Sequence, residues 1–125
     1  MKVIVLGSGG GSGIPNPFCL CANCETARAN GGRSLRNSPA VLINDDLLID
    51  CGSDVETGAR QLGLRLHNLR TLIITHRHSD HLHPWFFWER RSVSGTELPL
   101  LTVYAPQDAI EDVVGFYQTS VAWDR

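Results

Sequence analysis

The sequence predicts an α/β (α+β) protein, because short β-branched and aliphatic runs are interspersed with segments of helical periodicity. The runs with strand character are residues 2–6, 38–44, 47–50, 72–74 and 100–104. The segments with helical periodicity are residues 53–62 and 107–118. With 125 residues and 42% hydrophobic content, the chain can build one modest core, so residues 1–125 are expected to form a single domain.

The first expected strand, residues 2–6, leads into a glycine-rich loop at residues 7–13. Such a loop after a strand is typical of dinucleotide-binding proteins. Here, however, the third glycine of the G-x-G-x-x-G fingerprint falls on Ser12. Pro15 and Pro17 also prevent a helix from starting where a pyrophosphate would need its N-terminus. We therefore favour a close-packed or flexible loop that uses the positive φ angles open to glycine.

Three cysteines follow the glycine loop as Cys19-x-Cys21-x-x-Cys24. This spacing lets one tight loop wrap a zinc ion, and a structural zinc takes four ligands in a closed tetrahedron. Cys51 and His67 are the internal candidates for the fourth ligand. The alternative is that the three thiols are free and buried.

Residues 38–50 predict a β-hairpin, because two apolar runs flank the polar turn 44–46. The next helix is expected to begin at a capping box formed by Ser53 and Glu56 and to end before Gly63. Its core face is expected to hold Val55, Ala59 and Leu62.

A cluster of metal-binding residue types follows the strand at 72–74. His76 and His78 are two residues apart, so in an extended chain both imidazoles project to the same side and can converge on one cation. Asp80 and His81 point to a second cation, because a carboxylate beside an imidazole suits Zn, Mn or Fe. Two neighbouring metals can hold and activate a water between them. Four such residues in this order favour a site over exposed histidines without a role.

The segment after this cluster is aromatic and basic. Residues 85–88 are Trp-Phe-Phe-Trp, and Arg90 and Arg91 follow, which predicts a packed helix with a basic edge. The alternative is a surface that stacks nucleic-acid bases and holds phosphates. His83 is either a donor to the site, a substrate contact or an exposed loop histidine. The later helix is expected to carry one apolar face with Ile110, Val113, Val114 and Tyr117.

Charge and composition exclude some functions. Eleven basic and thirteen acidic residues give a net charge of -2, so no global positive field favours nucleic acid. Residues 1–6 are far too short for a signal peptide or a membrane span, and we expect a cytoplasmic protein. Its cysteines are then expected to be thiols or metal ligands rather than disulfides.

The histidine cluster resembles the signature of the metallo-β-lactamase superfamily of binuclear metal hydrolases. The resemblance implies that His76 and His78 bind the first metal and that Asp80 and His81 bind the second, with Asp80 also near the nucleophilic water. The turn at residues 50–52 resembles the Asp-x-Gly turn below the metals. The implied fold is the N-terminal half of a four-layer αββα sandwich, a mixed sheet with helices on one face.

The opening of the chain narrows the resemblance to one branch of this superfamily. A glycine-rich loop, a proline and the cysteine loop resemble the phosphodiesterase branch typified by the carbon-phosphorus lyase accessory enzyme. That branch implies a structural zinc on Cys19, Cys21 and Cys24, with a histidine from beyond Arg125 as the fourth ligand. Cys51 is then a packing residue. A branch for pyrroloquinoline quinone biosynthesis shares the cysteine loop.

The resemblance implies a metal-dependent hydrolase, with phosphodiesters as the expected substrates, two divalent metals (Zn or Mn) and one structural Zn. Asp50 or Thr75 would fix the imidazole tautomers. No histidine follows His83, so the remaining active-site ligands are expected from outside this chain. The alternatives are a catalytically inactive zinc-binding fragment, a tRNA-processing nuclease and a quinone-biosynthesis relative. The expected partner is a small phosphodiester substrate and not a membrane. A homodimer stays open, and nucleic acid is not favoured.

Overall fold

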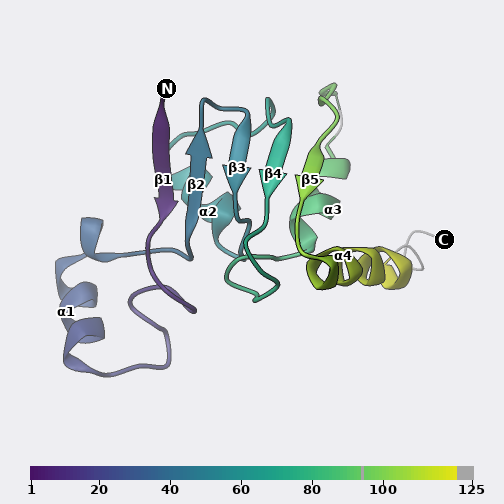
Figure 1. Ribbon diagram of the computed structural model, residues 1–125. Coiled ribbons are helices and arrows are strands. Elements are labelled where there is room, and N and C mark those ends of the chain that lie inside the picture. The colour runs from purple at the N-terminus through teal and green to yellow at the C-terminus, as the bar shows by residue number, and fades with distance from the viewer. Residues whose placement is uncertain (94, 121–125) are drawn as a thin grey trace.

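The computed structural model describes residues 1–93 and 95–120, and the strands form one five-stranded sheet in the order β1-β2-β3-β4-β5 (Figure 1). The strands are β1 (Val3–Gly7), β2 (Ala40–Ile43), β3 (Leu47–Ile49), β4 (Thr71–Ile73) and β5 (Thr102–Tyr104). The helices are α1 (Ala22–Asn30), α2 (Val55–Gln61), α3 (Trp85–Arg91) and α4 (Gln107–Ser120), with a 3-10 turn at Gly32–Ser34. β1, β2 and β3 pair antiparallel and β3, β4 and β5 pair parallel, so the sheet is mixed as predicted.

The core lies on one face of the sheet. Leu42, Leu48 and Leu72 are register partners on successive strands, and each is at most 1% exposed. Full burial of each such side chain contributes about 1.5–3 kcal/mol. The helices add buried residues to the same core, namely Val55, Ala59, Phe86 and Ala109. Figure 1 shows α2 and α3 on this face, behind the sheet, which confirms the predicted placement of helices on one face.

The other face of the sheet carries the alternate residues of each strand, because successive side chains point to opposite sides. Most are apolar, and those on the outer strands are exposed, with Val5 at 56% and Tyr104 at 61%. Val5 pairs with Val41, and Val41 pairs with Ile49, so the apolar surface continues from β1 into the middle of the sheet. This face is therefore less covered than the face that carries the core.

The hairpin was predicted correctly. The turn between β2 and β3 places Asn44 and Asp45 in the left-handed region, with φ of 51° and 69°, which these residues tolerate better than most. Lys2 N donates to Asn44 Oδ1 at 2.8 Å, so the turn is also tied to the start of the chain.

The predicted capping box of α2 is wrong. The N-cap residue is Asp54, and no side chain caps the helix. The carboxylate of Asp54 instead accepts hydrogen bonds from the backbone N and Oγ of Ser38, at 3.1 and 3.0 Å. Glu56 turns toward α3 instead of back to the helix start, as shown below. Leu62, expected in the core, is 52% exposed because the helix ends at Gln61 and leaves it as the C-cap.

The aromatic segment forms a helix, as predicted. Phe86 of α3 is buried, and the rings of Trp85 and Trp88 stack with their centroids 4.3 Å apart. α4 is joined to the segment after β4 by an ion pair of 2.8 Å between Arg77 and Asp112. Among the helices that the structure describes, none is long and apolar enough to cross a membrane.

Candidate functional site

The histidine loop, defined as residues 75–83, leaves the sheet where β4 ends. Because β3 and β4 are parallel, their carboxyl ends meet at one edge of the sheet, and this brings Asp50 next to Thr75. The backbone N of Thr75 donates to Asp50 Oδ1 at 2.8 Å. The sheet topology therefore places a carboxylate directly beneath the first residue of the loop.

Backbone hydrogen bonds hold the far end of the loop against the segment after β3. Cys51 N donates to the carbonyl of His81, and His83 N donates to the carbonyl of Cys51, both at 2.8 Å. Gly52 makes this approach possible, because a Cβ built there would lie 2.1 Å from the carbonyl oxygen of Asp80. Only glycine fits at that position without a backbone shift.

Asp50 organises the side chains of the loop. It is 5% exposed and has a φ of 62°. Its Oδ1 accepts from the backbone N of Thr75, and the Thr75 hydroxyl lies 3.0 and 2.9 Å from the two carboxylate oxygens. Its Oδ2 lies 2.8 Å from His81 Nδ1. A proton on Nδ1 is thereby held by Asp50, which leaves the Nε2 lone pair of His81 free.

The free nitrogen of His81 faces Asp80. His81 Nε2 and Asp80 Oδ2 are 3.1 Å apart, and both side chains are less than a fifth exposed. Two ligand atoms that each lie about 2.1 Å from one cation are roughly 3.4 Å apart at a tetrahedral angle. The spacing of this nitrogen and oxygen thus fits a shared divalent cation.

The other two histidines lie beside this pair. The ring centroids of His76 and His81 are 4.0 Å apart, and those of His76 and His78 are 4.7 Å apart. Thr75 Oγ1 lies 3.1 Å from His76 Nδ1. The rings of His76, His78 and His81 therefore lie beside one another, and the role of these residues and Asp80 as metal ligands stays a prediction.

The glycine-rich loop reaches the same site, a contact that sequence reasoning missed. Gly11 N donates to Asp80 Oδ2 at 3.1 Å. β1 ends at the same edge of the sheet as β3 and β4 (Figure 1), so the loop after β1 lies near the loop after β4. The loop is close-packed at its start, where a Cβ on Gly7 would lie 1.9 Å from the carbonyl oxygen of Ser38. The sequence feature that could have predicted this contact is the glycine-rich segment directly after a strand.

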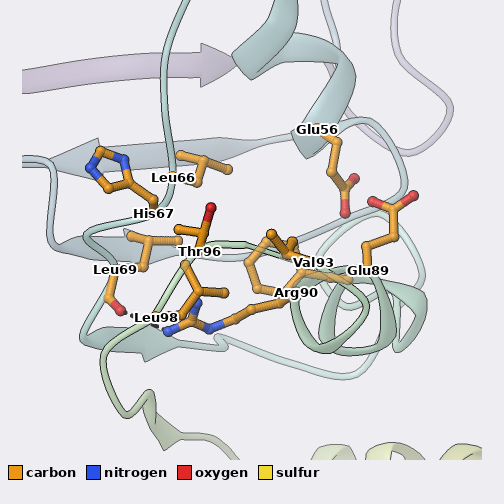
Figure 2. Close-up of a pocket in the computed structure, with 10 residues that line it drawn as sticks. Glu56, Leu66, His67, Leu69, Glu89, Arg90, Val93, Thr96 and Leu98 are labelled. Carbon is orange, nitrogen blue, oxygen red and sulfur yellow. Dashed lines mark hydrogen bonds between the residues drawn. The ribbon is translucent and has the colours of Figure 1, made fainter.

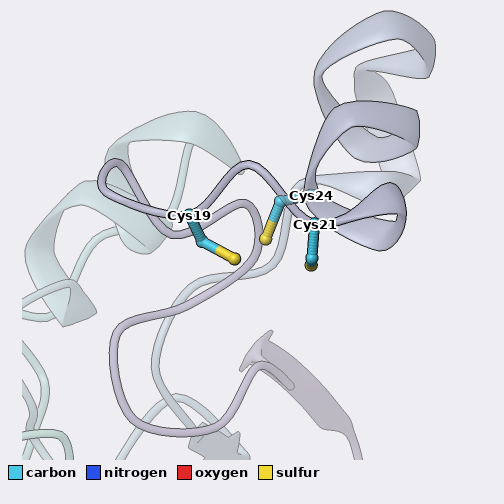
Figure 3. A group of neighbouring side chains, drawn as sticks. All are labelled: Cys19, Cys21 and Cys24. Atoms are coloured by element: carbon cyan, nitrogen blue, oxygen red, sulfur yellow. The ribbon is translucent and has the colours of Figure 1, made fainter.

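The cysteine loop, residues 19–24, forms a second cluster (Figure 3). The sulfur atoms of Cys19, Cys21 and Cys24 all lie within 4.8 Å of one another. Thiolates bound to one tetrahedral zinc are roughly 3.8 Å apart, so a small closure would complete three of four ligands. In the described ranges 1–93 and 95–120, these cysteines alone bring three donor atoms so close together.

The thiols differ in acidity. Hydrogen bonds from the backbone of Cys24 and from the side chains of Cys19 and Cys24 lower the pKa of Cys21 to about 7. Burial raises the pKa of Cys51 to about 12. A thiol that ionises near neutral pH is ready to bind a metal, whereas Cys51 stays protonated in the core, where it is completely buried. The pKa of Cys51 fits the interpretation of this residue as a packing residue.

Comparison with family models relates this chain to a known protein family. The model for Anti-Pycsar protein Apyc1 matches residues 33–102, which include the hairpin, α2 and the whole histidine loop. The chain belongs to this family. Individual proteins are also similar to this chain, over stretches of different length. An Apyc1 protein of Bacillus phage vB_BveM-Goe7 is 50% identical over 59 residues, which cover 46% of this chain and 23% of the phage protein.

Two further relatives bear other names. An octanoyltransferase of Porphyromonas gingivalis is 30% identical over 122 residues, or 90% of this chain and 22% of that protein. Coenzyme PQQ synthesis protein B of Bradyrhizobium diazoefficiens is 44% identical over 46 residues, or 37% of this chain and 15% of that protein. The chain spans less than a quarter of the length of each of these three relatives.

Solved structures show the fold. Zinc-bound PqqB from Methylobacterium extorquens matches with a TM-score of 0.71 and 23% identity, over 94% of this chain and 41% of PqqB. A diphosphatase of the PhnP family matches with a TM-score of 0.71 and 24% identity, over 96% of this chain and 47% of that enzyme. Both are metallo-β-lactamase fold proteins, and the predicted fold class is confirmed. The matching family model is that of Apyc1, so the phosphodiesterase branch inferred from the cysteine loop stays a prediction.

Proposed function

We propose that this chain belongs to a metal-dependent hydrolase of phosphodiester bonds, in which His76, His78, Asp80 and His81 hold two divalent metals. The observation that carries the proposal is the Asp50–His81–Asp80 arrangement, with contacts of 2.8 and 3.1 Å. Such a carboxylate behind a histidine is how proteins orient an imidazole toward a metal. A diphosphatase among the fold relatives supports phosphoryl chemistry in general.

The residues suit divalent zinc or manganese, since the set offers imidazole nitrogens and a carboxylate oxygen. When bound, such metals lower the pKa of a water and neutralise charge that develops on phosphoryl oxygens. Asp80 would then hold the attacking water by a carboxylate oxygen and orient it toward phosphorus. Gly11 N keeps the same carboxylate in place. Asp50 keeps the proton of His81 on Nδ1, so that Nε2 stays a ligand.

We also propose a structural zinc on Cys19, Cys21 and Cys24. The distances between the three sulfur atoms support it. The fourth ligand is a residue outside the cysteine cluster. The function of this zinc would be to hold the cysteine loop and the start of α1 against the sheet edge.

We propose further that the chain corresponds to the N-terminal half of a two-sheet sandwich. It spans 41% and 47% of the two solved relatives, and one apolar face of its sheet is only partly covered. A second sheet that covers Val5 and Tyr104 would bring further metal ligands to the same edge. The substrate we propose is a small phosphodiester, consistent with a net charge of -2 that gives no field for long nucleic acids.

The test is to measure metal content together with zinc- or manganese-dependent cleavage of bis(p-nitrophenyl) phosphate, of a cyclic 3′,5′-nucleotide and of a diphosphate. His78→Ala should abolish metal-dependent cleavage, and Asn68→Ala, on the exposed loop before β4, should not change it. Activity that survives in His78→Ala would rule out the site. A wild-type chain that binds zinc only through the cysteines and cleaves none of the probes would favour the alternative, a catalytically inactive zinc-binding fragment.

A further inference from the structure

A cavity of about 280 Å³ lies between α2 and α3, away from the histidine loop (Figure 2). Its walls include Leu66 and Leu69 from the loop before β4, Phe86 from α3 and Leu98 from the segment before β5. The histidine loop follows β4, whereas Leu66 and Leu69 precede it, so the cavity and the candidate metal site lie toward opposite ends of that strand. Its volume is close to the lower end of the range for small-molecule sites.

One end of this apolar cavity is anionic. Figure 2 shows the carboxylates of Glu56, on α2, and Glu89, on α3, facing each other there. Glu56 Oε1 is buried and has no hydrogen-bond partner among the residues that the structure describes. Glu89 Oε1 accepts from Trp85 Nε1 at 3.1 Å. A buried carboxylate oxygen without a donor is unfavourable unless something else supplies one.

The cation on the cavity wall does not supply that donor. The Arg90 guanidinium donates to the backbone carbonyls of Leu69, at 3.2 Å, and Pro99. These bonds tie α3 to the loops on either side of the cavity. The positive charge of Arg90 is therefore engaged with backbone oxygens, while the two glutamates share their end of the cavity.

The acidity of Glu56 reflects this environment. Burial raises its pKa to about 7, together with a side-chain hydrogen bond to Glu89 and the charge of Glu89, although a hydrogen bond from its own backbone and the charge of Arg60 act in the other direction. An ammonium group at this position would offset the repulsion between the carboxylates and the loss of water around them. It would also provide the missing hydrogen-bond donor.

We infer that this cavity binds a small organic cation, with its ammonium group between Glu56 and Glu89 and its hydrocarbon part against Leu66, Leu69 and Phe86. The apolar walls exclude a bare metal ion, which needs several oxygen or nitrogen ligands around it. The carboxylates at the polar end exclude an anion as well, because they make that end negative. The inference is independent of the proposed hydrolase function, since it uses none of the residues of the histidine loop.

The test is a titration of the whole chain, labelled with ¹⁵N and ¹³C, followed by NMR. Benzylammonium is the probe, and benzyl alcohol is the neutral control of nearly the same shape. We expect saturable shifts at Leu66, Leu69 and Phe86, with benzylammonium binding at least tenfold more tightly than the alcohol. Equal affinities for the two probes, or shifts scattered over the surface, would overturn the inference.

Variants make the test specific. Glu56→Gln keeps the shape of the side chain and should remove the preference for the cation, while Glu111→Gln, on the exposed side of α4, should keep it. Leu98→Trp should fill the cavity and weaken the binding of both probes at least fivefold, while the chain stays folded. A cation preference that persists in Glu56→Gln, or unchanged binding in Leu98→Trp, would contradict the assignment. His78→Ala should bind benzylammonium as the wild type does, which separates this site from the metal site.

Discussion

The histidine loop and the cysteine loop are both short segments rich in metal-binding residues, but the fold supports them differently. The histidine loop starts from a central strand, and Asp50 and the Cys51 backbone fix both of its ends. The cysteine loop lies beyond the end of β1 (Figure 1), and apolar side chains in it and beside it are exposed, with Leu20 at 81% and Phe18 at 96%.

The donor atoms, by contrast, lie closer together in the cysteine loop than in the histidine loop. The three sulfur atoms of the cysteine loop are already close together, whereas the histidine loop groups its donors in neighbouring pairs. The comparison teaches that the sheet can hold a ligand loop in place before the ligand set is complete. The peripheral cysteine loop lacks such support from the sheet, so its order would depend on the proposed zinc.

The largest effect is expected for Gly52→Ala. The added methyl group would lie 2.1 Å from the carbonyl oxygen of Asp80, so the histidine loop must move away from the sheet. We expect a loss of about 3 kcal/mol in the free energy of unfolding, measured by urea denaturation. Gly10→Ala is the control, because a Cβ there meets nothing within 4 Å. Equal stabilities of the two variants would show that the loop is not held by this contact.

A smaller effect is expected for Asp50→Asn. The amide loses the charge that attracts His81 Nδ1–H, and its NH₂ group cannot accept from Thr75. We expect a loss of about 2 kcal/mol in the free energy of unfolding. The control is Asp45→Asn, since Asp45 has a similar φ of 69° but lies in an exposed turn. If both variants lost the same stability, backbone conformation would be the cause rather than the hydrogen bonds.

Cys21→Ser is expected to act locally. Loss of the proposed zinc should speed hydrogen exchange in the cysteine loop and α1, and it should leave exchange unchanged in the histidine loop. The free energy of unfolding of the sheet should change by less than about 1 kcal/mol, because Cys21 lies outside the core. Asn23→Ala changes an exposed neighbour without removing a thiol. Faster exchange in the histidine loop of Cys21→Ser would mean that the two loops depend on each other.

A small effect that depends on pH is expected for Glu56. Its pKa is raised from 4.5 to about 7, so the folded state disfavours the ionised form. This penalty is absent below pH 4.5, grows between pH 4.5 and 7, and is complete above pH 7. Relative to Glu56→Gln, the wild type should lose on the order of 1 kcal/mol across that window, after allowance for the half-exposed side chain. Thermal denaturation at pH 4 and pH 8 measures it, and a difference that does not depend on pH would contradict it.

The sequence predicted the sheet, because each strand is an apolar run bounded by glycine or polar turns. It also predicted that His76, His78, Asp80 and His81 lie in one loop after a strand, and their role as metal ligands stays a prediction. It did not predict the contact of Gly11 with Asp80, which depends on two loops meeting at one sheet edge. Glu56 shows the same limit: its spacing from Ser53 fits a capping box, but packing against α3 decides its position.

The central claim is that the sheet holds the histidine loop as a metal site. The most direct measurement is calorimetric titration of zinc into a chain in which Cys19, Cys21 and Cys24 are all replaced by Ser. We predict saturable binding that Asp50→Asn weakens at least tenfold and that Asp45→Asn leaves unchanged. No saturable binding, or binding that survives both Asp50→Asn and His78→Ala, would contradict the claim.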